Sequence, residues 1–186
     1  KRSGKNAPWG KPINLGMPVN SEYDEFYPTL ALNNNLYFTM DAPSGMGKDD
    51  IYYAPYQDGV YGQPQILGSA INSDGYEFNA FISKNEDFII FTKYNNEGGF
   101  GSGDLYISRR DSDNNWTKSE NLGPSINTRL MEYCPYYDQE NATLYFTSRR
   151  KTIETKKFTT FDELQNYMMD GENGLSKIYK VHMKLH

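Results

Sequence analysis

The sequence predicts an all-β fold made of repeated four-stranded antiparallel sheets, with one short helix near residues 161–169. Three observations support this expectation. Short runs of β-branched and aromatic residues alternate with clusters of turn-forming residues. The apolar spacing that marks an amphipathic helix is absent over the first 150 residues. Finally, one pattern returns three times along the chain, which is the signature of a repeat architecture.

The repeat is visible in several motifs that keep nearly constant spacing. The tripeptide NLG at 14–16 aligns with ILG at 66–68 and NLG at 121–123, offsets of 52 and 55 residues. The block NSEYDEFYP, which starts at Asn20, returns as NSDGYEFNA and NTRLMEYCP. LYFT in the first repeat becomes IIFT in the second and LYFT in the third. Such constant phase predicts one supersecondary unit per repeat.

Each repeat is expected to hold four short strands. In the first they are FYPTLAL, NLYFTM, DIYYAPY and YGQPQIL, separated by turn signals such as Asp58-Gly59. Four strands in about 40–50 residues is the pattern of a β-propeller blade. The expected blades span about 23–74, 75–129 and 130–186 of a single domain over 1–186. Residues 1–22 are expected to supply the last strand of a preceding or closing blade.

An insertion interrupts the third repeat between Arg150 and Ile178. Thr160 and Glu163 form the pattern of a capping box, and Gly171 is a suitable stop signal. These signals predict a helix over about 161–169. The simplest role for it is to cover a rim or an edge of the sheets, and the alternative is a lid or partner-binding element.

Three blades do not close a ring by themselves, because closed propellers have about 4–8 blades and an open stack leaves sheet edges exposed. Two arrangements stay open. In the first, which we favour because the chain opens on KRSGKNAP without an initiator Met, amino-terminal blades of a longer protein complete the ring. In the second, two copies of the chain form a homodimer with a six-bladed ring.

Composition excludes several classes of function. The net charge is −5 and no dense Lys/Arg stripe occurs, so nucleic acid is not an expected partner. No apolar run approaches the ~18 residues of a transmembrane segment. Cys134 is the only cysteine and the chain has two histidines, so we expect no disulfide, no metal site and no cofactor.

The combined motifs resemble the TolB-like, WD-like repeats of bacterial envelope β-propellers. The resemblance rests on WGKPINLG, NSEYDEFYP, LYFTM, GMGKDDIYY and GGFGSGDLYIS, and it covers almost the whole chain except the insertion. It implies a six-bladed propeller outside the cytoplasm, in the periplasm, associated with the outer membrane or secreted, that mostly binds other proteins. Lys177 departs from the pattern, since the other repeats have Asp50 and Asp104 there.

The candidate binding residues come from the repeated block before the first strand of each repeat. In a propeller this block lies near one face, around the central channel. Carboxylates there could bind a cation or a basic peptide, whereas a structural carboxylate would accept backbone N–H bonds in every repeat. The candidates are Tyr23, Asp24, Glu25, Tyr76, Glu77 and Glu132.

The expected function is therefore a non-catalytic protein-binding or scaffold propeller of the bacterial cell envelope. No G-x-S-x-G motif or histidine-based triad is present in the sequence, which argues against an enzyme. The alternative is a carbohydrate-binding or carbohydrate-active protein, because paired acids and tyrosines on the same face suit a glycan.

Overall fold

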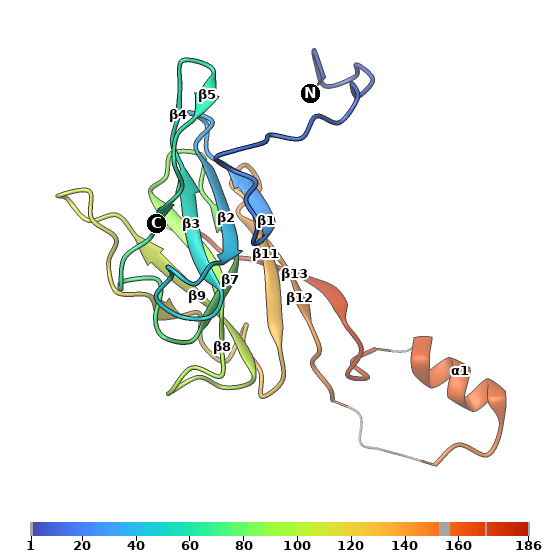
Figure 1. The fold of residues 1–186 in the computed structure, drawn as a ribbon. Coiled ribbons are helices and arrows are strands. Elements are labelled where there is room, and N and C mark those ends of the chain that lie inside the picture. Colours follow the sequence, from blue (N-terminus) through green and yellow to red (C-terminus); the bar gives the residue numbers. More distant parts are fainter. Residues whose placement is uncertain (1, 153–156, 170, 186) are drawn as a thin grey trace.

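The computed structural model describes residues 2–152, 157–169 and 171–185. The chain is predominantly β, with three larger antiparallel sheets, a two-stranded hairpin and one short helix (Figure 1). Each larger sheet is built from strands of one repeat, and only in the first sheet does a hairpin (β4–β5) lie between two paired strands, β3 and β6, in the chain. The order of strands in space therefore follows the order in sequence.

The first two sheets each contain four strands. The first sheet has the order β1 (Asp24–Leu30), β2 (Leu36–Asp41), β3 (Asp50–Ala54) and β6 (Gln65–Ile66). The second has the order β7 (Tyr76–Ile82), β8 (Phe88–Tyr94), β9 (Gly103–Arg109) and β10 (Glu120–Asn121). The fourth strand is only two residues long in both sheets.

The third sheet has three strands, β11 (Glu132–Asp138), β12 (Thr143–Ser148) and β13 (Lys177–His182). Residues 1–22 were expected to supply the last strand of a blade, but the part of this segment that the structure describes, 2–22, including WGKPINLG at 9–16, pairs with no sheet. A strand forms only where another strand supplies partners for its backbone, and this segment meets none.

A small hairpin, β4 (Tyr56–Gln57) and β5 (Val60–Tyr61), branches from the first sheet and was not predicted. Pro55 has no N–H to continue the ladder of β3, so the expected strand DIYYAPY stops at Ala54. Asp58 and Gly59 then turn the chain with positive φ angles of 53° and 89°, as a tight hairpin turn requires.

Consecutive sheets pack face to face through two apolar cores. Tyr37 and Ile51 of the first sheet are buried against the second sheet, with Ile82, Ile89 and Phe91. A second core joins the second and third sheets in the same manner. A third cluster, around Phe38 and Tyr52, lies on the outer side of the first sheet.

The same buried asparagine links the sheets at both junctions. Asn72 accepts a hydrogen bond from the Ile51 N–H (2.9 Å) and donates one to the Ile51 carbonyl (3.0 Å). Asn127 makes the same pair of bonds to Leu105, at 2.8 and 2.9 Å. Each asparagine thus pairs with the backbone of the preceding sheet as a strand residue would.

The turn that carries each asparagine presses against a glycine in the loop of the preceding sheet. A Cβ at Gly47 would lie 2.6 Å from the Ser73 carbonyl oxygen, and one at Gly101 would lie 2.4 Å from that of Thr128. Only glycine permits this approach. We call residues 19–25, 71–77 and 126–132 the docking turns.

The predicted helix is present as α1 (Phe161–Met169), and Thr160 caps it by accepting a hydrogen bond from the Glu163 N–H (3.2 Å). None of its residues is buried, and Figure 1 shows it standing apart from the sheets. It therefore does not cover a rim as expected: the contact of its Tyr167 ring with Phe158 (4.9 Å) lies within the insertion, and no described residue of the helix is buried. Parts of this insertion, 153–156 and 170, lie outside the described residues. Within the described chain, no helix has the length and apolarity that crossing a bilayer requires.

The close contact at Gly101 gives a direct test of the junction. We expect Gly101→Ala to lower the free energy of unfolding by about 1–3 kcal/mol, because the new methyl group overlaps the docking turn. The matched control is Gly68→Ala, since no atom lies within 4 Å of a Cβ there, and its effect should stay within about 1 kcal/mol. Equal effects in urea denaturation would contradict the assignment.

Candidate binding face

The docking turns and the glycine-rich loops lie at one common edge of the sheets. The start of each first strand pairs with the end of the second, as in Asp24 with Asp41 and Tyr76 with Tyr94. The loops 42–49 and 95–102 follow directly and contact the next docking turn, for example through the bond from the Lys48 N–H to the Gly75 carbonyl (2.8 Å). We call this surface the turn face.

In each docking turn a glutamate accepts bonds from the residue four positions before it. Glu77 accepts from the N–H and the hydroxyl of Ser73, at 2.8 and 2.6 Å. Glu132 accepts from Thr128 in the same way, at 2.7 and 2.9 Å. Glu25 accepts from both groups of Ser21. The carboxylate thereby closes the turn that enters the preceding sheet.

Two of the three glutamates also have a cationic neighbour. Lys93, itself buried, places its Nζ 3.5 Å from Glu77 Oε1. In the third repeat Arg150 takes this role, with a 4.0 Å contact to Glu132. The first repeat has Met40 at the position of Lys93, and Glu25 has no ion pair among the described residues.

The predicted site residues thus separate into two groups. Glu77 and Glu132 are buried and Glu25 is half-buried, each bound to its own turn. Tyr23, Asp24 and Tyr76 are exposed on the turn face. Among residues 2–152, 157–169 and 171–185, no group of three or more His, Cys, Asp or Glu side chains is arranged to hold a metal ion.

The glycine-rich loops add exposed apolar groups that the sequence reasoning missed. Met46, Tyr94 and Phe100 are exposed, and the ring of Tyr94 meets that of Tyr76 edge to face at 5.8 Å. A carboxylate at the base of each loop fixes its shape. Asp50, for example, accepts bonds from the N–H groups of Met46 (2.8 Å) and Gly47 (3.0 Å). An aromatic residue within a glycine-rich loop, such as Phe100, was the feature of the sequence that could have indicated these exposed groups.

A second polar cluster forms where the first strands of the three sheets meet. Tyr27, Asn79 and Cys134 occupy one repeat position, a β-bulge with positive φ in all three strands. The Tyr27 hydroxyl donates to the Pro135 carbonyl (3.0 Å), and Asn79 Nδ2 lies 3.1 Å from Cys134 Sγ. Burial raises the pKa of the Cys134 thiol, which disfavours a reactive thiolate.

The opposite edge of the sheets has a carboxylate cluster that joins the first two repeats. Glu86 accepts hydrogen bonds from Asn33 (2.7 Å), Asn35 (3.0 Å) and the hydroxyl of Tyr37 (2.6 Å). Burial alone would raise the pKa of Glu86, but the bonds from Tyr37, Asn35 and Asn33 outweigh it and hold that pKa below its ordinary value. This carboxylate therefore stabilises the folded state in its ionised form.

Comparisons with known proteins add no assignment. No protein-family model matches the chain, and a search of curated proteins finds no significant match.

The two kinds of glutamate should differ in their effect on stability. Glu77→Ala leaves buried Lys93 without its counter-charge, so we expect a loss of about 3–5 kcal/mol in the free energy of unfolding. Glu25→Ala removes hydrogen bonds only and should cost about 1–2 kcal/mol. Urea denaturation at neutral pH measures both. Similar losses would show that the Lys93 contact contributes nothing.

The Glu86 cluster predicts a pH dependence of stability. Because the pKa of Glu86 is lowered by folding, its contribution is complete above the ordinary value of 4.5 and is lost as the pH falls through the folded pKa. We expect Glu86→Gln to cost about 1–3 kcal/mol at pH 7. The difference between wild type and variant should shrink as the pH is lowered below 4.5. A difference that is constant or grows on acidification would be evidence against this role.

Proposed function

We propose that the chain is a non-catalytic protein-binding β-propeller of the bacterial cell envelope, with TolB-like repeats. Each larger sheet is then one blade, and the three blades belong to a six-bladed ring. The periplasm, the outer membrane or the exterior of the cell is the proposed location. The turn face is the proposed binding surface.

Two features of the fold support the propeller architecture. The sheets stack face to face in chain order, and the same asparagine and glycine contacts recur at both junctions. In addition, Tyr27 of the first sheet reaches Pro135 of the third, so the first strands curve around a common line. Radial repetition of this kind protects sheet edges, which is the advantage of a propeller.

The observation that carries the binding proposal is the combination of aromatic and acidic groups on the turn face. Tyr23, Tyr76, Tyr94 and Phe100 are exposed there, and the exposed Asp24 follows Tyr23 at the start of β1. Exposed aromatic side chains supply much of the binding energy in protein interfaces. Acidic neighbours favour a partner segment that is basic. A protein with a basic, partly apolar segment is therefore the proposed partner.

The contacts of the acidic side chains on the turn face favour binding over catalysis. Each docking-turn glutamate is committed to its own turn, and the two buried ones face a cation. An acid–base pair for hydrolysis needs carboxylates that are free to exchange a proton with a substrate. Asp24 and Asp41 face each other across β1 and β2 and are both exposed, which suits recognition of a basic segment.

A second candidate function follows from the pair formed by Tyr76 and Tyr94. The two rings are exposed and meet edge to face, and exposed aromatic rings also suit the apolar face of a sugar. This supports carbohydrate binding, or a carbohydrate-active enzyme, as the alternative on the same surface.

A photo-cross-linking experiment tests the proposed binding surface. A benzophenone amino acid replaces Tyr76, and the protein is irradiated with a cell-envelope fraction. We expect adducts with an envelope protein that Tyr23→Ala and Phe100→Ala weaken. The control position is Leu32, which is exposed at the opposite edge of the sheets and should give no such adduct. Equal labelling from both positions would contradict a specific turn-face partner.

A glycan array and a screen of glycoside substrates distinguish the carbohydrate function from protein binding. Binding that Tyr76→Ala abolishes would favour the carbohydrate function, and hydrolysis would overturn the non-catalytic assignment. The expected result is neither binding nor hydrolysis.

A further inference from the structure

Each junction between sheets has a receiving side on the earlier sheet and an inserting side on the later one. Equivalent repeat positions form each side at both junctions. On the receiving side of the first sheet, Tyr37, Ile51 and Gly47 face the second sheet. On the inserting side of the second sheet, Asn72 and Ile82 enter the junction. The second and third sheets repeat this arrangement.

The third sheet keeps the receiving residues but nothing covers them in the described chain. Ile178 stands where the other sheets have Ile51 and Leu105, and it is 78% exposed whereas those residues are 0% exposed. Tyr145, at the position of Tyr37, is likewise partly exposed. Gly174 aligns with Gly47 and Gly101, yet an added Cβ would meet no atom closer than 3.8 Å. Among the described residues, no docking turn occupies this position.

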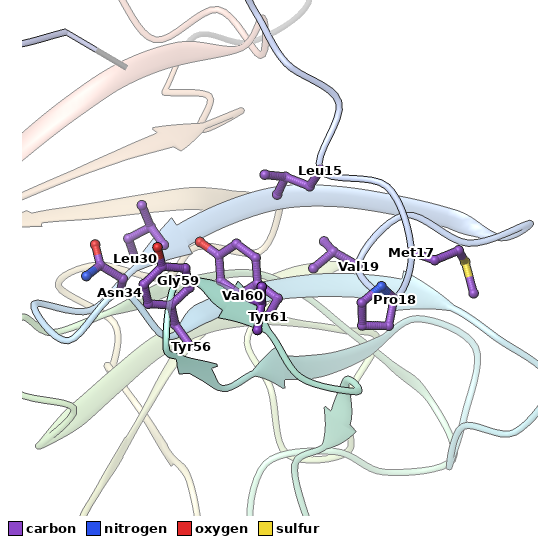
Figure 2. A pocket seen from close by; sticks show the side chains of 10 residues that line it. All are labelled: Leu15, Met17, Pro18, Val19, Leu30, Asn34, Tyr56, Gly59, Val60 and Tyr61. Atoms are coloured by element: carbon purple, nitrogen blue, oxygen red, sulfur yellow. The ribbon is translucent and has the colours of Figure 1, made fainter.

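The first sheet keeps the inserting residues. Val19, Leu36 and Phe38 are buried in its outer cluster, but one inserting position is uncovered. Leu30 is 54% exposed, whereas Ile82 at the same repeat position is 2% exposed. The side-chain amide of Asn20, the counterpart of Asn72, makes no hydrogen bond among the described residues. A cavity of about 310 Å³ opens here, and Figure 2 shows Leu15, Val19 and Leu30 on its lining.

The third sheet also has one strand fewer than the first two sheets among the described residues. β3 and β9 each pair with a short fourth strand, but β13 is an edge strand among the described residues. The fourth strand of the first sheet, Gln65–Ile66, corresponds to Ile13 and Asn14 in the repeat. That segment pairs with no strand in the part of the chain that the structure describes, and Trp9 and Ile13 are among the most exposed apolar side chains. The third sheet therefore lacks a fourth strand, and the segment around Ile13 and Asn14 has the sequence of one.

We propose that two copies of this chain bind head to tail, so that residues 9–25 of each copy dock on the third sheet of the other. Asn20 of one copy then bonds the backbone N–H and C=O of Ile178 in its partner. Ile13 and Asn14 pair with Lys180 and Tyr179, in the register that Gln65 and Ile66 have with Tyr53 and Tyr52. Two identical junctions close a ring of six sheets, within the ~4–8 blades of closed propellers.

A second copy is the occupant that we infer because both halves of the junction are present on one chain, once each. The two internal junctions show that these halves fit, down to the paired bonds of Asn72 and Asn127. The inference concerns assembly and holds whether the turn face binds a protein or a sugar.

Light scattering on the purified chain tests the assembly. We expect a particle of twice the 21.4 kDa chain mass. Ile178→Asp should give monomers, and it should leave each chain folded because the side chain is exposed. Met169→Asp on α1 is the matched control, with an exposure of 79%, and should stay dimeric. A monomeric wild type, a dimeric Ile178→Asp variant, or polymers that grow with concentration would each overturn the closed dimer.

A mixing experiment identifies the head-to-tail mode. Asn20→Asp damages the inserting side, and Ile178→Asp damages the receiving side. Each variant alone has two damaged junctions, whereas a mixed dimer has one intact junction. We therefore expect dimers to return when the two monomeric variants are mixed. No recovery would contradict the pairing of these two residues.

Discussion

The structure depends on one interaction, the insertion of a docking turn into the sheet before it. Asn72 and Asn127 satisfy the buried N–H groups of Ile51 and Leu105. They also donate to the carbonyls of these residues, which Leu67 and Leu122 bond as well. Each turn can enter only because a glycine leaves room for its backbone. The apolar cores between sheets then form at the distance that these polar contacts set.

This constraint explains why the repeat keeps glutamate in register. The glutamate closes the turn from inside, through the N–H and hydroxyl of the residue four positions earlier. Because the glutamate and the residue four positions earlier hold the turn, the residues between these two can differ among the repeats and be exposed. Tyr23 and Tyr76 are such residues. Tyr94, at the end of β8, meets the ring of Tyr76, and the loop 95–102 adds the exposed Phe100. A rigid repeated frame thus presents a variable aromatic and acidic surface.

The sequence predicted the β-rich fold and the helix at 161–169, because strand and cap signals are local. It also indicated that the repeated glutamates can be structural, which the contacts of Glu77 and Glu132 illustrate. The cationic partners of these glutamates could not be predicted, because they depend on contacts between residues distant in the sequence. The cation beside Glu132 comes from Arg150, two positions past the residue that aligns with Lys93. The hairpin at Asp58-Gly59 and the unpaired segment 9–16 depend on neighbours that no local pattern specifies.

Hydrogen exchange of individual backbone amides tests the role of the docking turns most directly. In the wild type, the Leu105 amide should exchange only through global unfolding, because Asn127 holds it in the junction. In an Asn127→Ala variant, the Leu105 amide and the third sheet should exchange at a lower free energy than the first sheet. Uniform protection of all three sheets in that variant would contradict the view that the asparagine contact joins the repeats.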